Sequence, residues 1–242
     1  MDKNALSYWF PKLEAAGLPV PKTIIVPMPE LAQKCLWAAL DGKDLHRAEA
    51  EKFFLEISRA ANQVGLPCFL RTDHTSGKHG WQSTCYLHST AVITGHVYSI
   101  VEYSVMAGLV GLPWDTWAVR EMLPTKPFGV CPRYGNMPIC REFRFFVQDA
   151  RVVCFHPYWP REALEQGRAS ADLAYEELTS LNGEDLREIM DLASSAGRAV
   201  GGAWSVDILD TARGWFITDM AEAELSWHWP GCAEAALGGL QV

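Results

Sequence analysis

The sequence predicts an α+β protein made of antiparallel hairpins and separate helices. Apolar runs of strand length come in pairs joined by polar turns, at residues 204–222 and 139–155. Longer stretches carry the apolar spacing of amphipathic helices, at residues 30–40, 44–64, 89–110 and 183–200. Paired strands with short turns form antiparallel sheets, and the helices supply the second layer that covers them.

Composition narrows the function classes. The chain of 242 residues is 49% hydrophobic and 21% charged, enough for one large domain or two small ones. Its formal net charge of −8 argues against broad nucleic-acid binding through a basic surface. The 7 Cys include no C-x-x-C pair, so we expect reduced thiols rather than a zinc site or a disulfide framework. With no signal-like N-terminus or membrane-length apolar run, we expect a cytoplasmic protein.

The first part of the chain supplies helices and one strand. Residues 4–18 predict a short amphipathic helix, provided that Pro11 lies in its first turn. Residues 23–26 are apolar and end at a proline, which favours a buried strand. The helices at 30–40 and 44–64 follow, and Gly65-Leu66-Pro67 ends this region.

A polar loop with a lysine follows the strand at residues 68–71. Residues 72–81 contain two Gly, with Ser76 next to Gly77 and Lys78. Backbone N–H groups of such a loop can surround phosphate oxygens, and a lysine adds a point charge. It is not a Walker loop, because Thr72 stands where the first Gly is needed. A surface hairpin loop is the alternative interpretation.

The strand at residues 117–124, which follows the helix at 89–110, ends in Glu121-Met122-Leu123-Pro124. Free backbone groups beside apolar side chains can read the edge of an adenine, although an ordinary strand end has the same pattern. Residues 124–138 contain four Pro and two Gly, which favours a boundary between lobes or a lid.

The strand at 139–147 carries an arginine on each face. Arg144 shares one face with Glu142, and Arg141 lies on the other. An arginine in so apolar a strand needs an anionic partner. Glu142 is one candidate partner, and a phosphate is the other.

Two aspartates interrupt the apolar strands of the last hairpin. Asp207 and Asp219 share one face if the turn holds three or five residues, because side chains alternate with period two. Two converging carboxylates suit Mg²⁺, which is usually shared with substrate phosphates. A half-exposed hairpin with solvated acids is the alternative. We find no Ser-His-Asp or Cys-His arrangement for a side-chain nucleophile.

The order of these pieces resembles the ATP-grasp superfamily, in which two α+β lobes clasp ATP between antiparallel sheets. It is most similar to the divergent branch that includes the cell-division-cycle assembly chaperone of a translation initiation factor. The local likeness is greatest in Arg141-Glu142-Phe143-Arg144-Phe145-Phe146-Val147, and the opening Phe10-Pro11-Lys12-Leu13 also fits. The resemblance implies an N-terminal α/β segment at 1–66, a small lobe at 67–124 and a C-terminal lobe at 125–242.

The resemblance also implies roles for single residues. Arg71 takes the place of a phosphate-binding lysine, Ser76 and Lys78 belong to the loop over the phosphates, and Glu121, Met122 and Leu123 form the adenine-reading hinge. Arg141 or Arg144 reaches the phosphates in catalysis, and Asp207 and Asp219 bind Mg²⁺. The usual acid-x-Asn pair is missing, because Ala221 stands two places after Asp219. Either Glu222 or Glu224 then supplies the missing ligand, or the site binds fewer metals.

The activity implied by the resemblance is ligation of a carboxylate to an amine through an acylphosphate, with ATP and Mg²⁺. The substrate is a small carboxylate or a peptide. The alternative is an ATP-binding chaperone or interaction module that acts on a protein partner without turnover. A nucleotidyl transferase is disfavoured, because the Lys-x-Asp/Asn-Gly motif is missing. The segment Trp227-His228-Trp229-Pro230 is interpreted as substrate wall, partner surface or core packing.

Overall fold

The computed structural model describes residues 2–43, 47–107, 111–165, 171–229 and 232. The chain divides into two compact units. The hairpin unit comprises Met1–Pro21, Leu123–Cys131 and Pro138–Val242, and the helical unit comprises Lys22–Met122 and Pro132–Met137. The beginning of the predicted helix at 44–64, the end of the one at 89–110, residues 166–170 and residues 233–242 lie outside the described part.

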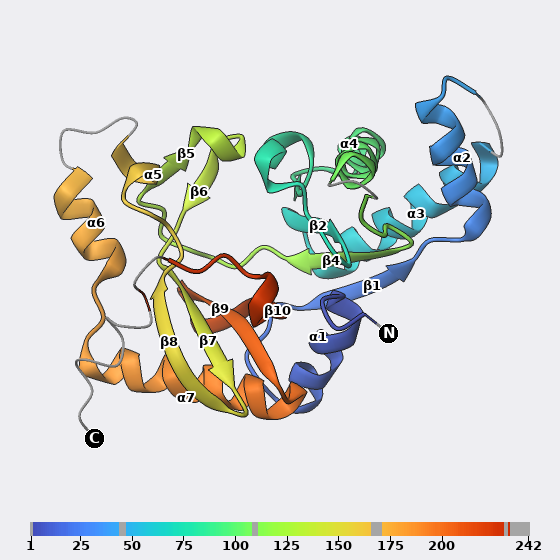
Figure 1. Ribbon diagram of the computed structural model, residues 1–242. Helices are drawn as coiled ribbons and strands as arrows, with labels where there is room; N and C mark the ends of the chain where they lie inside the picture. Colours follow the sequence, from blue (N-terminus) through green and yellow to red (C-terminus); the bar gives the residue numbers. More distant parts are fainter. Residues whose placement is uncertain (1, 44–46, 108–110, 166–170, 230–231, 233–242) are drawn as a thin grey trace. The chain divides into compact units, whose positions relative to one another are not determined.

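The helical unit contains a four-stranded antiparallel sheet in the order β1-β4-β2-β3 (Figure 1). The chain order of its elements is β1 (Thr23–Pro27), α2 (Glu30–Leu40), α3 (Arg47–Val64), β2 (Cys68–Thr72), η1 (Lys78–Ser83), β3 (Tyr86–Leu87), η2 (Thr90–Val92), α4 (Ile93–Met106), β4 (Thr116–Glu121) and η3 (Pro132–Tyr134).

The core of the helical unit lies between this sheet and α3. Phe53 and Ile57 come from one face of α3 and are fully buried with Leu70 and Val119 of the sheet. The ring of Phe53 meets Trp117 edge-on, with 5.8 Å between centroids. The apolar face of α3 therefore explains why a helix with so many charged residues packs stably.

The hairpin unit contains a second four-stranded antiparallel sheet, in the order β10-β9-β7-β8, and a small sheet of β5 and β6 (Figure 1). The chain order of its elements is α1 (Leu6–Ala15), β5 (Gly129–Cys131), β6 (Met137–Ile139), β7 (Glu142–Gln148), β8 (Arg151–Pro157), α5 (Glu162–Glu165), α6 (Ala171–Thr179), α7 (Gly183–Val200), β9 (Ala203–Thr211), β10 (Gly214–Glu222) and η4 (Ala223–Leu225).

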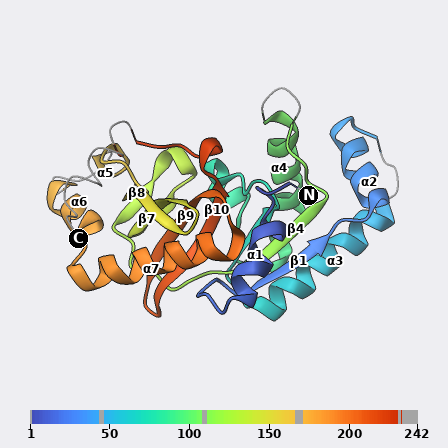
Figure 2. The same cartoon turned by 60° about the horizontal axis from the view of Figure 1, so that its bottom comes forward.

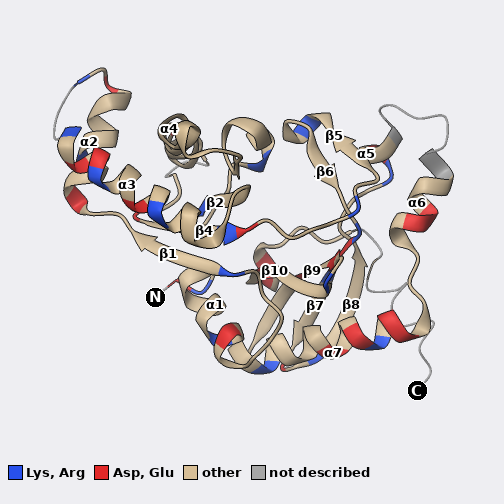
Figure 3. Cartoon of the chain, turned by 180° about the vertical axis from the view of Figure 1, so that it is seen from behind, with Lys and Arg blue, Asp and Glu red and all other residues tan. Residues whose placement is uncertain are grey.

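Helix α7 covers one face of the hairpin sheet (Figure 2). Its N-cap is Asn182, whose side chain accepts hydrogen bonds from the next turn, and its C-cap is Gly201 with φ +72°. A Cβ on Gly197 would lie 2.6 Å from Val147, so only glycine permits this approach. Figure 3 shows the acidic and basic residues along α7. Every second side chain of β7 and β9, among them Phe145 and Val206, lies on the buried face of the sheet. The opposite face carries the polar side chains of these strands.

The α+β class predicted from the sequence is confirmed, and both predicted hairpins form, as β7–β8 and β9–β10. One local prediction is wrong: Pro11 lies inside α1 and not in its first turn. The helix persists because Leu6, Trp9 and Leu13 are buried, which outweighs one missing backbone donor. Among the described residues, no helix has the length and apolar character needed to cross a bilayer.

We predict that His96 makes the protein sensitive to acid. Its Nδ1 lies 2.6 Å from the Thr84 carbonyl oxygen, and burial lowers the pKa of His96 below its usual value. The unfolded chain then binds the proton more tightly than the folded chain. The contribution of neutral His96 to the unfolding free energy is therefore complete above about pH 6.5 and is lost as the pH falls below it. His96→Asn keeps a donor without titrating there. Its unfolding free energy in urea should fall less with acid, by up to about 1.4 kcal/mol per pH unit.

The exposed His79, changed to Asn, is the matched control and should keep the acid sensitivity of the parent. Identical pH dependence in the His96 variant and the parent would contradict the assignment.

Candidate nucleotide and metal site

The two aspartates of the last hairpin lie directly opposite each other. Thr211 pairs with Gly214, so the turn holds two residues, not three or five. This offset continues to Ile217 and would by itself place Asp207 and Asp219 on opposite faces. The register shifts by one residue between Ile217 and Asp219, and beyond this bulge Asp219 faces Asp207. The bulge therefore restores the shared face that the turn alone would have removed.

Four polar residues form a row across the hairpin sheet. From β8 to β10 they are His156, Arg144, Asp207 and Asp219, each the cross-strand partner of the next. Cross-strand partners project their side chains from the same face. The row therefore gathers an imidazole, a guanidinium and two carboxylates.

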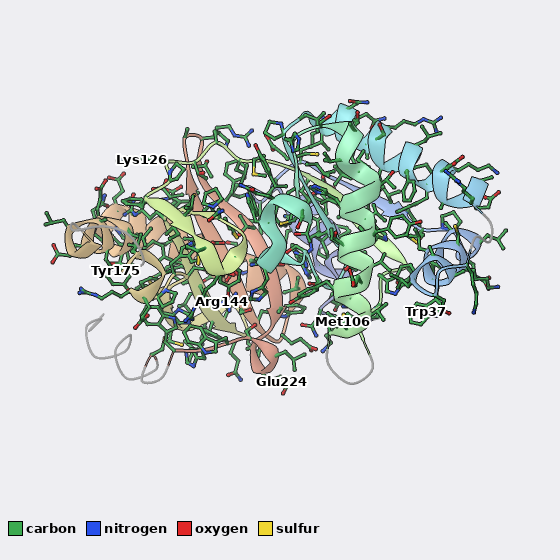
Figure 4. The ribbon with its side chains drawn as sticks, turned by 90° about the horizontal axis from the view of Figure 1, so that it is seen from above. Trp37, Met106, Lys126, Arg144, Tyr175 and Glu224 are labelled. Atoms are coloured by element: carbon green, nitrogen blue, oxygen red, sulfur yellow. The ribbon has the colours of Figure 1, made fainter. Side chains whose placement is uncertain are left out.

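Arg144 and Asp207 form a bidentate ion pair at the centre of the row (Figure 4 labels Arg144). Nε and Nη2 of Arg144 lie 2.7 and 2.8 Å from the two oxygens of Asp207, which is 3% exposed. Burial alone would lower the pKa of Arg144, but the adjacent carboxylates of Asp207 and Asp219 raise it well above its usual value. The third nitrogen, Nη1, donates to the Trp227 carbonyl, and the guanidinium lies 5.1 Å from the ring centre of Tyr158.

The carboxylates of the row suit a hard divalent cation. Oδ1 of Asp219 accepts from the Met220 backbone N–H, and both oxygens of Asp207 accept from Arg144. A carboxylate offers about four lone-pair sites, so a carboxylate that already accepts hydrogen bonds can also coordinate a cation. Thr218, the residue at the bulge, donates to Glu142 at 3.0 Å, which brings a third carboxylate beside the row. Mg²⁺ commonly uses one or two carboxylates and keeps the remaining positions for water and phosphates.

The structure does not bring Glu222 to these acids. Glu222 pairs with Trp204 in the register, whose side chains belong to the opposite face from Asp219. Its carboxylate contacts Lys3 at 3.2 Å and Asn4 at 3.2 Å. Glu224 lies beyond the strand, exposed in η4 (Figure 4). The residue that does share the face of Asp219 is Ala221, the cross-strand partner of Ser205.

Arg141 belongs to a different group of charges. Its guanidinium contacts Asp210 at 3.0 Å and Asp185 at 3.3 Å, and also donates to the Ser180 carbonyl. These contacts line a hollow of about 500 Å³ that also includes Lys126. The structure thus pairs each arginine with an aspartate, while Arg141 lies on the face opposite Arg144.

In the helical unit, Arg71 and the loop after it form a compact turn. Nε of Arg71, which is 6% exposed, donates to the Thr72 carbonyl, and Nη2 donates to that of Asp73. The Thr72 hydroxyl accepts from the Thr75 backbone N–H at 3.0 Å. Ser76, which is buried, follows this turn.

The predicted phosphate loop is more ordered than an open loop. Gly77 has φ +58°, and Lys78 begins the 3₁₀ helix η1. The Thr84 hydroxyl donates to the Gly77 carbonyl at 2.8 Å. A Cβ on Gly135 would lie 2.7 Å from the Trp81 backbone nitrogen, so the 132–137 segment packs directly on η1. These contacts therefore fix the backbone from which the side chain of Lys78 extends.

The predicted hinge lies where the chain changes units. Strand β4 ends at Glu121, and the unit boundary falls between Met122 and Leu123. Glu121 exchanges two hydrogen bonds with Lys22, one through its backbone N–H and one through Oε2. Met122 is half-buried and Leu123 is buried.

Sequence reasoning missed His156 and the thiols near it. His156 is 4% exposed, its Nδ1 lies 2.8 Å from the Pro157 carbonyl oxygen, and its Nε2 has no hydrogen-bond partner among the described residues. Burial lowers the pKa of His156, with the positive charge of Arg144 acting in the same direction. The neutral ring therefore presents an unshared electron pair at Nε2. The only available sequence signal was its spacing two residues from Cys154 on one strand face.

We predict that Arg144 is essential for the stability of the hairpin sheet. Arg144→Met keeps the aliphatic volume and leaves Asp207 buried without its cation. The unfolding free energy in urea should fall by about 3–5 kcal/mol, and adding Asp207→Leu should recover much of that loss. The exposed Arg151, changed to Met, is the control and should stay within about 0.5 kcal/mol of the parent. An Arg144→Met protein as stable as the parent would exclude this dependence.

Comparison with known proteins places the fold. No family model and no curated protein matches the sequence. The solved structure of C-terminally truncated Cdc123 from Schizosaccharomyces pombe has a TM-score of 0.61 at 14% identity, over 92% of this chain and 86% of that one. D-alanine–D-alanine ligase from Bacillus anthracis, complexed with ATP, has a TM-score of 0.53 at 9% identity, over 96% of this chain and 60% of that one. The chain therefore shares the α+β fold of these solved structures, as the resemblance to the ATP-grasp superfamily implied.

Proposed function

We propose that the protein binds ATP with Mg²⁺ and joins a carboxylate to an amine through an acylphosphate. The observation that carries the proposal is the row of Arg144, Asp207 and Asp219 on one face of the hairpin sheet. The ATP-grasp fold supports it, because the ligase among the structural neighbours was solved with ATP. The substrate class that we propose is a small carboxylate or a peptide.

In this proposal the acids of the row hold the cation. Asp219 is the main ligand, and Asp207 contributes a lone pair not used by Arg144. Bound Mg²⁺ would neutralise phosphate charge and fix the position of the γ-phosphate. Arg144 keeps Asp207 oriented. Three of its five N–H groups are used by Asp207 and Trp227, so the others can donate to a phosphate oxygen.

The reaction needs positioning and charge neutralisation more than a protein nucleophile. The substrate carboxylate attacks the γ-phosphorus and ADP leaves; the amine then attacks the acyl carbon, loses a proton, and phosphate leaves. Burial raises the pKa of Cys68, Cys85 and Cys140 to about 11, so these thiols are protonated at neutral pH and are poor nucleophiles. In the helical unit we propose that Arg71, Ser76 and Lys78 bind phosphate. We propose that Glu121, Met122 and Leu123, where the chain passes from one unit to the other, read adenine.

All seven cysteines are free thiols. A reducing compartment such as the cytoplasm therefore fits the proposed function.

The direct test of the metal site is Asp219→Asn. The change removes one negative charge and keeps the shape, so Mg-ATP turnover should fall by at least about 100-fold, the loss typical of one electrostatic contact in a transition state. Isothermal titration should show weaker ATP binding with Mg²⁺ and a smaller change without it. Thermal unfolding should remain near that of the parent.

Asp191→Asn is the matched control, because Asp191 is exposed on α7, which covers the face of the sheet opposite the row. It should keep parental binding and turnover. Unchanged ATP consumption by Asp219→Asn would remove Asp219 from the metal site.

A second candidate is an ATP-binding module that acts on a protein partner without ligase turnover. Ala221 favours it, because this residue occupies the place of an expected ligand on the face of Asp219 and offers no oxygen from its side chain. The fold likeness to Cdc123 points the same way.

The two candidates give different results with ATP, Mg²⁺ and pools of amino acids and small carboxylates. We expect phosphate release that depends on a pool, since a ligase needs both co-substrates before it turns over. Tight ATP binding with no stimulation by any pool would instead favour the chaperone-like module. Lack of ATP binding under all conditions would contradict both.

A further inference from the structure

Three soft or borderline metal ligands meet on the polar face of the hairpin sheet. The Sγ atoms of Cys154 and Cys232 and a ring nitrogen of His228 all lie within 4.8 Å of one another. The Cys154 Sγ is 3.0 Å from the His228 Nε2. Ligands at about 2.3 Å from one tetrahedral ion stand roughly 3.8 Å apart, so small side-chain movements would close this triangle around a metal.

The positions of these residues are fixed by both the sheet and the C-terminal segment. Cys154 lies on β8, pairs with Phe146 of β7, and faces the same side as His156 two residues later. Cys232 packs with Cys154 and Phe146 in a small buried cluster, and Trp229 lies against it. His228 and Cys232 are separated by three residues, a spacing found in zinc-binding segments.

We propose that Cys154, His228 and Cys232 bind a thiophilic transition metal, with Zn²⁺ as the best fit. Two thiolates and an imidazole are typical ligands of tetrahedral zinc and disfavour Mg²⁺ and Ca²⁺, which prefer oxygen. The site differs from the proposed Mg²⁺ site in its residues and its ligand chemistry, and it does not rest on ATP binding. The sequence predicted no zinc site, because Cys154 is far from the other two ligands in the chain.

A second observation supports a ligand at this place. His156 is 4% exposed and its Nε2 has no partner among the described residues. Its ring centre lies 5.8 Å from that of His228 and 5.1 Å from that of Trp229. A buried polar atom without a partner is costly, and a metal or a metal-bound water beside it would satisfy it. His156 is therefore the candidate to contact the fourth ligand of the proposed site.

The metal would fasten the C-terminal segment to the sheet. Trp227 precedes His228 and accepts a hydrogen bond from Arg144 through its carbonyl oxygen. Coordination of His228 and Cys232 to Cys154 would hold that carbonyl in place. A structural zinc that joins distant segments adds its binding free energy to folding.

The test uses the full-length protein, purified under reducing conditions and freed of metal with a chelator. Titration with Zn²⁺ against a chromogenic chelator should show one tight equivalent per chain. Co²⁺ should give thiolate-to-metal charge transfer and the intense visible bands of tetrahedral coordination. Zn²⁺ should also raise the melting temperature of the parent.

Cys154→Ser and Cys232→Ser should each weaken Zn²⁺ binding by about 100-fold or more, since loss of an outer-sphere partner alone costs 10–100-fold. In each variant the charge-transfer bands should weaken, because only one thiolate remains. Cys140→Ser, a buried thiol of the same unit outside the cluster, is the matched control and should behave as the parent. Asp219→Asn should also keep the Co²⁺ spectrum, which separates this site from the proposed nucleotide site.

The proposal would be overturned if the reduced parent bound no stoichiometric Zn²⁺ or Co²⁺. It would also be overturned if the parent and both serine variants bound the metal equally. The remaining contrary outcome is a Cys154–Cys232 disulfide, found by mass spectrometry in protein isolated without reductant, together with failure of the reduced form to bind metal. The pair would then be a redox pair and not a metal site.

Discussion

The ion pair between Arg144 and Asp207 is the constraint on which the hairpin unit depends. These residues lie opposite each other on the adjacent strands β7 and β9, and both strands turn their other face to a buried apolar layer. A one-residue slip between the strands would carry a charged side chain into that layer and leave its partner buried alone. The bidentate bond therefore fixes the register of the sheet as well as the orientation of Asp207.

The bulge at Thr218 extends this constraint to the outer strand. A two-residue turn gives the hairpin a tight connection, but its offset would direct Asp219 away from Asp207. One extra residue in β10 reverses that direction while Ile217 and Met220 both stay buried. The hydroxyl of Thr218, at the inserted position, donates hydrogen bonds to Glu142 and to the Asp207 carbonyl. The local irregularity is thus what converts an ordinary hairpin into a site with two acids.

Sequence reasoning succeeded where the signal is local. The hairpin strands, the apolar faces of α3 and α7, and the α+β class follow from periodicity and turn residues. It could propose a shared face for Asp207 and Asp219 only for an odd turn, because face parity depends on turn length and on bulges that no local pattern reveals. The resemblance made Glu222 or Glu224 the candidate third ligand, whereas strand alternation sends Glu222 to Lys3 and Asn4. The cluster of Cys154, His228 and Cys232 joins segments that only the fold brings together.

The C-terminal segment connects the row of charged residues to the thiol cluster. Its Trp227 carbonyl uses one N–H of Arg144, and His228 and Cys232 meet Cys154 in the adjacent row of the sheet. Arg144 gives two of its five N–H donors to Asp207 and one to the Trp227 carbonyl. An anion that binds through this third donor, and not only through the two remaining ones, competes with the segment. Competition for one donor couples the binding of the anion to the docking of the segment, and such a coupling free energy is reciprocal. Whatever holds the segment against Arg144 lowers the affinity for an anion at that donor by the same factor by which the anion loosens the segment.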